Sequence, residues 1–231
     1  MQAIRVHPAP ASSTPYSVAN PAPSSAFKLD NDVPIPKPPK PGEILSRIKA
    51  ASKIPSRGMI FAGVVVDVFP GDGDHDRLKP GDEVFGMAHP DRGATWAEYT
   101  VVHRDEIALK PKKSTWEQAA AVPLSALIAY QALFDWAGVP VPDVSTSQRE
   151  AVQQHSSLSK SMRSAVCGRE RKTAFFIVQP SRRALEKLAA FADLGVLQPF
   201  VAGTYPLVKA KAAYECARTK SSKYGKIILT V

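Results

Sequence analysis

The amino-acid sequence predicts an α/β protein in which a small, strongly bent antiparallel sheet or barrel precedes helices and further strands. Two observations support this class. Between residues 43 and 111, short runs rich in β-branched and aromatic residues alternate with turns rich in Gly, Pro and Asp. After residue 114, alanines and leucines replace them at helical spacing, and strand-like apolar runs return only later.

The first half of the chain contains the sheet signals. Residues 1–42 are rich in proline, which fixes φ and lacks an N–H, so we expect extended chain lying over a domain surface. Five strands are then expected from apolar or alternating runs, at residues 43–50, 59–69, 83–88, 95–102 and 106–111.

Residues 114–138 are predicted to be helical. Ser114 and Glu117 have the spacing of a capping box, and Gly138 stands where a C-cap glycine would. Pro123 must break or kink the helix, so two helices in tandem are expected.

The last third of the chain returns to regular patterns. "TAFFIV" (173–178) is predicted to be a buried strand, and residues 181–195 an amphipathic helix with Ser181 as N-cap and Gly195 as C′. Residues 205–219 are predicted to form another helix with Pro206 near its first turn, and "KIILTV" a final strand.

The stretch from Gly138 to Val178 departs from the patterns on both sides. Its few apolar residues follow neither a period of 2 nor one of 3.6. Residues 144–172 carry six basic and two acidic groups with little apolar content, so we expect them to be poorly ordered.

Composition limits the partners. The net charge of +9 is concentrated in residues 144–231, which hold 15 basic and 5 acidic residues. Without a nucleic-acid motif, this favours a solvated basic face over nucleic-acid binding. No apolar run is long enough to span a membrane, and "MQAIRVHPAP" lacks the apolar core of a signal peptide, so a cytoplasmic protein without a membrane partner is expected.

Chemical motifs are sparse. Two cysteines, Cys167 and Cys216, are too few for a thiolate zinc site, and the histidines lack ligand-like spacing, so no metal is expected. Ser125 has no GxSxG elbow around it. The sequence contains neither GxGxxG nor GxxxxGK[ST], so spacing alone indicates no nucleotide site.

Two longer segments carry a specific resemblance. "LKPGDEVFG", followed by "GATWAEYTVVHRDEIALKPKKSTWEQAAAVPLSALIAYQAL", resembles the medium-chain dehydrogenase/reductase superfamily, in its zinc-independent quinone oxidoreductase or enoyl reductase-like branch. "MQAIRVH", "KPGEILSRIKA" and "FAGVVVDV" resemble that family's first strands, and residues 175–231 resemble its C-terminal segment.

The resemblance implies a GroES-like β-barrel lobe, partly truncated, plus a remnant of a Rossmann parallel sheet. Residues 1–138 would form the GroES-like lobe and 139–172 a linker replacing most of the Rossmann domain. Residues 173–203 would be the Rossmann remnant, and 204–231 a helix and strand that return to complete the barrel begun by "AIRVH" and "EILSRIKA". Only 29 residues separate Asp143 from Thr173. One βαβ unit takes about 30, and a dinucleotide fold needs two βαβαβ halves.

The family's function would be NADPH-dependent hydride transfer to a small-molecule quinone or α,β-unsaturated carbonyl, without zinc. The resemblance places Leu124, Ser125 and Ile128 near the nicotinamide and Lys226 near a cofactor phosphate. Ile128 stands where the family often has Thr, and it cannot hydrogen-bond. No catalytic residue is identified.

Two interpretations stay open. The resemblance implies an oxidoreductase, impaired in this truncated chain. The missing phosphate turn favours a catalytically inactive homologue that acts as a binding or interaction module. Substrate identity and a homodimer are left open as well.

Overall fold

The computed structural model describes residues 1–7, 22–38, 40–52, 59–69, 78–89, 95–142, 176–218 and 225–231. Residues 144–172, for which composition predicts poor order, lie outside these ranges, as does Cys167. Within the described ranges, no helix has the length and apolar character needed to cross a bilayer.

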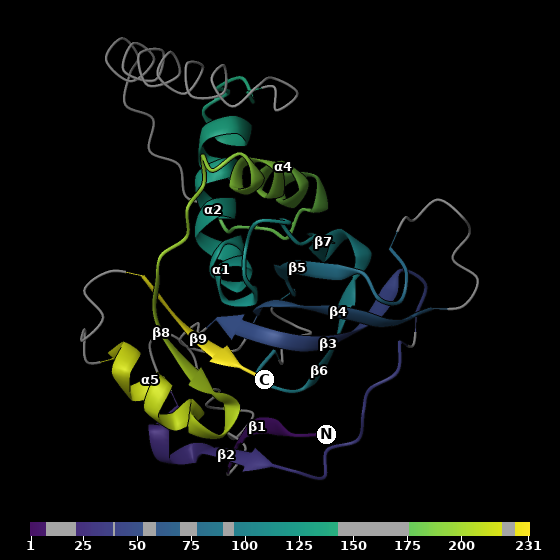
Figure 1. Cartoon of the computed structure of the whole chain (residues 1–231), viewed down its shortest axis with the longest axis vertical. Coiled ribbons are helices and arrows are strands. Elements are labelled where there is room, and N and C mark those ends of the chain that lie inside the picture. Colours follow the sequence, from purple (N-terminus) through teal and green to yellow (C-terminus); the bar gives the residue numbers. More distant parts are fainter. Residues whose placement is uncertain are drawn as a thin grey trace.

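A bent, seven-stranded sheet forms the centre of the structure (Figure 1). Its order is β7-β5-β4-β3-β9-β8, and β6 also pairs with β3. Every pairing is antiparallel except β8 with β9. The strands are β3 (Glu43–Ser52), β4 (Ile60–Val68), β5 (Glu83–Met87), β6 (Tyr99–His103), β7 (Ile107–Leu109), β8 (Val201–Pro206) and β9 (Lys226–Thr230). All five strands predicted between residues 43 and 111 are confirmed.

The N-terminal segment differs in part from the expected surface chain. β1 (Ala3–Val6) pairs antiparallel with β2 (Phe27–Asp30), which follows a 3-10 turn at Ser24–Ala26. Proline content alone gave no sign of β2. The Phe27 ring lies 5.7 Å from that of Trp96 and 4.6 Å from that of Tyr214, so tertiary contacts fix this strand.

The predicted break at Pro123 is confirmed, since α1 (Trp116–Ala121) ends before it and α2 (Pro123–Tyr130) starts at it. A π-helical turn (Gln131–Trp136) continues α2. The predicted capping box is wrong by one residue, because Thr115 and Gln118 make it, at 3.2 and 3.0 Å. Ser114 instead belongs to the preceding turn, where its backbone N–H donates to Pro111.

In the C-terminal third, the predicted helix at residues 181–195 is confirmed, whereas the described part of the predicted strand at 173–178 is not a strand. α4 (Arg182–Asp193) begins with the Ser181 hydroxyl accepting from the Ala184 N–H, as predicted. No strand forms at residues 176–178, the described part of "TAFFIV". Ile177 is 68% exposed, and the Phe176 ring stacks on that of Trp136 at 5.7 Å. An apolar run becomes a buried strand only beside a partner strand, and among the described residues none lies next to it.

The predicted helix at 205–219 starts later than expected. Its first two residues complete β8, which the sequence analysis missed. A 3-10 turn (Leu207–Lys209) then leads into α5 (Ala210–Arg218). Another 3-10 turn (Arg104–Glu106) joins β6 to β7.

β9 pairs antiparallel with β3. Its register with β3 aligns Ala50 with Thr230, Ala51 with Leu229, and Ser52 with Ile228. β1 pairs with β2 in a separate two-stranded sheet.

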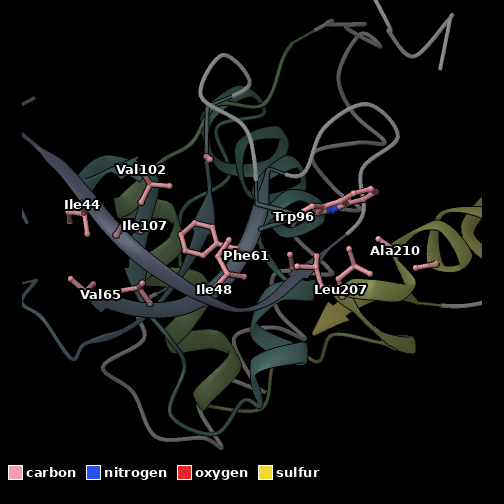
Figure 2. Close-up of a cluster of buried hydrophobic side chains, with 14 of the residues drawn as sticks. Ile44, Ile48, Phe61, Val65, Trp96, Val102, Ile107, Leu207 and Ala210 are labelled. Carbon is pink, nitrogen blue, oxygen red and sulfur yellow. The ribbon is translucent and has the colours of Figure 1, made fainter. Parts of the chain in front are cut away.

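The sheet separates two hydrophobic clusters, which we call the barrel core and the helical core. The barrel core lies inside the bent sheet and includes Ile44, Ile48, Phe61, Val65, Trp96, Val102, Ile107, Leu207 and Ala210 (Figure 2). The helical core lies between the sheet and the layer of α1, α2 and α4. Ile227 and Leu229 enter the barrel core and Ile228 enters the helical core, so β9 is buried on both faces.

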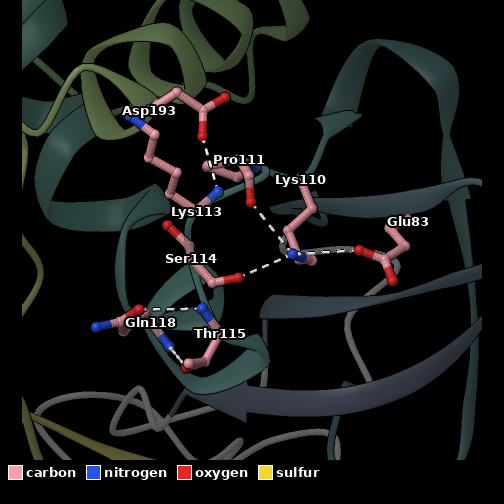
Figure 3. A network of polar contacts seen from close by, with 8 residues as sticks. All are labelled: Glu83, Lys110, Pro111, Lys113, Ser114, Thr115, Gln118 and Asp193. Carbon is pink, nitrogen blue, oxygen red and sulfur yellow. Dashed lines mark hydrogen bonds and ion pairs between the residues drawn. The ribbon is translucent and has the colours of Figure 1, made fainter.

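A buried lysine holds α1 in place against the sheet (Figure 3). The Lys110 side chain is 7% exposed, and its ammonium lies 3.2 Å from a carboxylate oxygen of Glu83 on β5. The same ammonium donates to the carbonyl oxygens of Pro111 at 3.2 Å and Ser114 at 2.8 Å, and it stands over the Trp116 ring.

The same turn holds the end of α4. The Lys113 N–H donates to the Asp193 carboxylate at 3.0 Å (Figure 3). One turn therefore orients α1 and α4, and α2 packs on α4 and β5.

We expect Ile228→Ala and Leu229→Ala each to lower the free energy of unfolding by about 2–5 kcal/mol, because each removes a buried side chain from a different core. Urea denaturation followed by tryptophan fluorescence measures the loss. Ile177→Ala is the matched control, since this side chain is exposed and should change stability by less than about 0.5 kcal/mol. Wild-type stability of either β9 variant would contradict the two-sided burial.

Candidate functional site

Three of the four predicted site residues lie on α2. Leu124 is half-buried against the helical core, whereas Ser125 and Ile128 are exposed. Ile128 has 43% of its surface exposed. α2 therefore presents one hydroxyl and one apolar side chain to the surface.

The fourth residue, Lys226, begins β9. Gly225 precedes it with φ of +105°, and a Cβ there would lie 2.7 Å from the carbonyl oxygen of Phe200. The Lys226 N–H donates to that same oxygen at 2.8 Å. Glycine is therefore needed at residue 225 both for its backbone angle and for the close approach of β8.

The Lys226 ammonium is electrostatically unusual. The residue is half-buried, and burial lowers the pKa of Lys226 below its usual value. In the part of the chain that the structure describes, the ammonium has no hydrogen bond or ion pair. A desolvated cation without a partner is a candidate for binding an anion.

All four residues lie on the helical side of the sheet. Lys226 is two residues from Ile228, and alternate residues of a strand face the same side. Ile228 enters the helical core together with residues of α1 and α2. The structure thus places the four residues on one side of the sheet, where α1 packs on β9 and α2 packs on α4 and β5.

Sequence reasoning missed one polar residue on this side. Ser52 ends β3 directly opposite both Ile60 and Ile228, two members of the helical core. It is fully buried, and its hydroxyl has no hydrogen-bond partner among the described residues. Nearby, the Thr95 hydroxyl does have one, because it donates to the Ile60 carbonyl at 3.3 Å. The only sequence signal for this site is that the strand "EILSRIKAAS" ends in a serine.

A side-chain clamp joins α2 to the chain that precedes α4. The Gln131 amide donates to the Gln179 carbonyl at 2.7 Å and accepts from the Gln179 N–H at 3.1 Å. Next to this clamp, Tyr130 packs edge-on against Phe134. Its pKa is raised, first by burial and then by the charge of Asp135.

Metal-binding groups do not converge in the described ranges, where no cluster of three or more His, Cys, Asp or Glu side chains could hold an ion.

Comparison with known proteins gives three findings. The family model "Zinc-binding dehydrogenase" matches residues 139–229. A "Probable zinc-binding oxidoreductase, mitochondrial" of Arthroderma benhamiae is 49% identical over 62 residues, which is 27% of this chain and 19% of that protein. The 2-methylene-furan-3-one reductase of Solanum lycopersicum is 40% identical over 97 residues, or 38% of this chain and 24% of that protein.

The fold has solved counterparts. The quinone oxidoreductase from Coxiella burnetii superposes with a TM-score of 0.71 at 17% identity, covering 100% of both chains. The curated matches are much shorter. For the two relatives above, the chain spans only 19% and 24% of their length.

Lys226→Met should make the folded chain more stable than wild type at neutral pH. Burial places the folded-state pKa of Lys226 below 10.5, so at neutral pH the charged ammonium bears a desolvation cost only when folded. Between the folded-state pKa and about 10.5, the unfolded chain binds more protons, so wild-type stability rises with pH and the gap to the variant closes.

Urea unfolding of both proteins across this alkaline range measures that difference. Lys209→Met is the control, because the Lys209 side chain is exposed and its removal should leave the difference near zero. A Lys226→Met variant that is less stable than wild type at neutral pH would show that the ammonium has a stabilising partner.

Proposed function

We propose that this chain, as a quinone oxidoreductase-like member of the medium-chain dehydrogenase/reductase superfamily, is an NADPH-dependent oxidoreductase with impaired hydride transfer. Its substrate class would be a quinone or an α,β-unsaturated carbonyl. The observation that carries the proposal is that α2 and Lys226, whose ammonium has no partner among the described residues, lie on the same side of the sheet.

The relatives support a nicotinamide reductase. One is named as a reductase of 2-methylene-furan-3-one, and another as an NAD(P)H oxidoreductase. The cytoplasmic location stays a prediction, since several relatives are mitochondrial by name. A homodimer and the absence of zinc stay predictions as well.

The described residues offer groups that suit parts of NADPH. A half-buried, partnerless ammonium suits a phosphate, and the exposed Ser125 and Ile128 offer a hydroxyl and an apolar contact. The glycine-rich turn whose N–H groups hold a pyrophosphate is missing from the whole sequence.

When bound, the cofactor supplies the hydride, and the protein orients it. This chain contributes charge at Lys226, a hydroxyl at Ser125 and exclusion of water at Leu124 and Ile128. Ile128 cannot hydrogen-bond to the nicotinamide, which weakens orientation. The 29 residues between Asp143 and Thr173 are too few for two mononucleotide halves, which supports impairment.

The second candidate is a catalytically inactive homologue that acts as a binding or interaction module. The missing phosphate turn favours it. Under this hypothesis the two cores are retained for the fold alone, and neither cofactor nor quinone is used.

We expect micromolar NADPH not to raise the melting temperature of the full chain, because the pyrophosphate turn is missing. A ligand at 100 times its dissociation constant adds about 2.7 kcal/mol, a shift that thermal melting detects easily. NADPH oxidation with an added quinone is followed in parallel. Slow turnover supports the impaired reductase, and no turnover at any NADPH concentration supports the inactive module. A dose-dependent melting shift at micromolar NADPH would contradict impairment.

A further inference from the structure

Two polar groups on the helical side of the sheet lack partners, and they are neighbours. Ser52 is aligned with Ile228 across the β3–β9 ladder, and Lys226 lies two residues before Ile228. Residues directly opposite in an antiparallel pair face the same side, and diagonal neighbours stand about 7–8 Å apart, within reach of a long side chain. Lys226 is therefore the diagonal neighbour of Ser52 on the same face.

Both groups are left without a partner in the described structure. The Ser52 hydroxyl is fully buried and makes no hydrogen bond, and the Lys226 ammonium has neither a hydrogen bond nor an ion pair. Buried hydroxyls and ammonium groups without partners destabilise a fold. A buried hydroxyl and a half-buried ammonium on neighbouring positions of one face suggest that a ligand could satisfy both.

The chemistry of that ligand follows from the donors. A serine hydroxyl and an ammonium both donate, so one oxygen can accept from both. An oxyanion is favoured over a neutral carbonyl because charge-assisted hydrogen bonds are about twice as strong as neutral ones. Burial lowers the pKa of Lys226, and a bound anion would offset that effect.

We propose that the Ser52 hydroxyl and the Lys226 ammonium together form a binding site for one oxyanion at the end of the β3–β9 ladder. The ligand oxygen belongs either to a phosphate of the dinucleotide or to the enolate that forms when an α,β-unsaturated carbonyl accepts a hydride. This identification of the ligand rests on the proposed function, whereas the site itself does not.

Ser52 is the last residue of β3, and Lys226 lies two residues before its partner Ile228, at the start of β9. Lys226 is half-buried, whereas Ser52 is fully buried. Gly225 allows the start of β9 to approach the backbone of Phe200 and Ala202, and this fixes the backbone position of Lys226.

The test compares Ser52→Ala with Ser46→Ala in the full chain. Ser46 is a matched control because it lies in the same strand, is fully buried and has a hydroxyl without a partner. It is aligned with Val65 of the barrel core, on the opposite side from Lys226. Both variants should raise the melting temperature, since each removes a buried, unsatisfied hydroxyl.

Anion binding separates the two variants. Pyrophosphate represents the cofactor, and 4-nitrophenolate represents an enolate. Each is titrated while the ε-carbon NMR signal of labelled Lys226, assigned by its loss in Lys226→Met, is followed. Ser52→Ala should bind the preferred anion about tenfold more weakly, as expected for one hydrogen bond to a charged group, and Ser46→Ala should bind like wild type.

The outcomes are distinct. Preference for pyrophosphate assigns the site to the cofactor, and preference for 4-nitrophenolate assigns it to the substrate. If neither anion shifts the Lys226 signal, or if Ser52→Ala binds like wild type or melts at a lower temperature, the site does not exist. Anion binding without quinone turnover would support the anion site and overturn the proposed reductase activity. Quinone turnover that is the same in Ser52→Ala as in wild type would support the reductase activity and overturn the anion site.

Discussion

The pairing of β9 with β3 is the interaction on which the rest of the structure depends. It joins two segments that lie more than 170 residues apart in the chain, through a ladder from Ala50–Thr230 to Ser52–Ile228. Because successive side chains of β9 enter opposite cores, this one strand couples the barrel core to the helical core. β8 joins the sheet only through β9, and α5 packs on both strands, so the C-terminal elements depend on it too.

Local signals predicted most of the elements, and tertiary contacts explain the failures. Pro123, Ser181 and the alternating apolar runs act within a few residues, so the helix break, the α4 cap and the strands were predictable. β2 depends on the Phe27 ring meeting Trp96 and Tyr214, which no local pattern reports. "TAFFIV" failed for the opposite reason, because a strand-like composition cannot supply a partner strand.

The candidate site was less predictable than the fold. Family resemblance identified Lys226 and the α2 residues, but it could not say that Lys226 is half-buried without a partner. Ser52 could not be identified from the sequence, because whether a hydroxyl has a hydrogen-bond partner depends on the residues packed around it. Sites often carry such local costs, which the packing elsewhere must offset. Here the apolar members of the two cores supply that stability, so the polar pair can persist.

The Gln131–Gln179 contact bears on how long the segment between these two residues can be. The carboxamide holds the Gln179 backbone by two hydrogen bonds, so Gln131 and Gln179 are joined directly to each other. The entropy cost of closing a loop grows only with the logarithm of its length. A clamped junction of this kind can accept a short connector or a whole inserted domain at similar cost. It is therefore a natural joint for exchanging modules between related proteins, and a practical point for grafting a foreign domain.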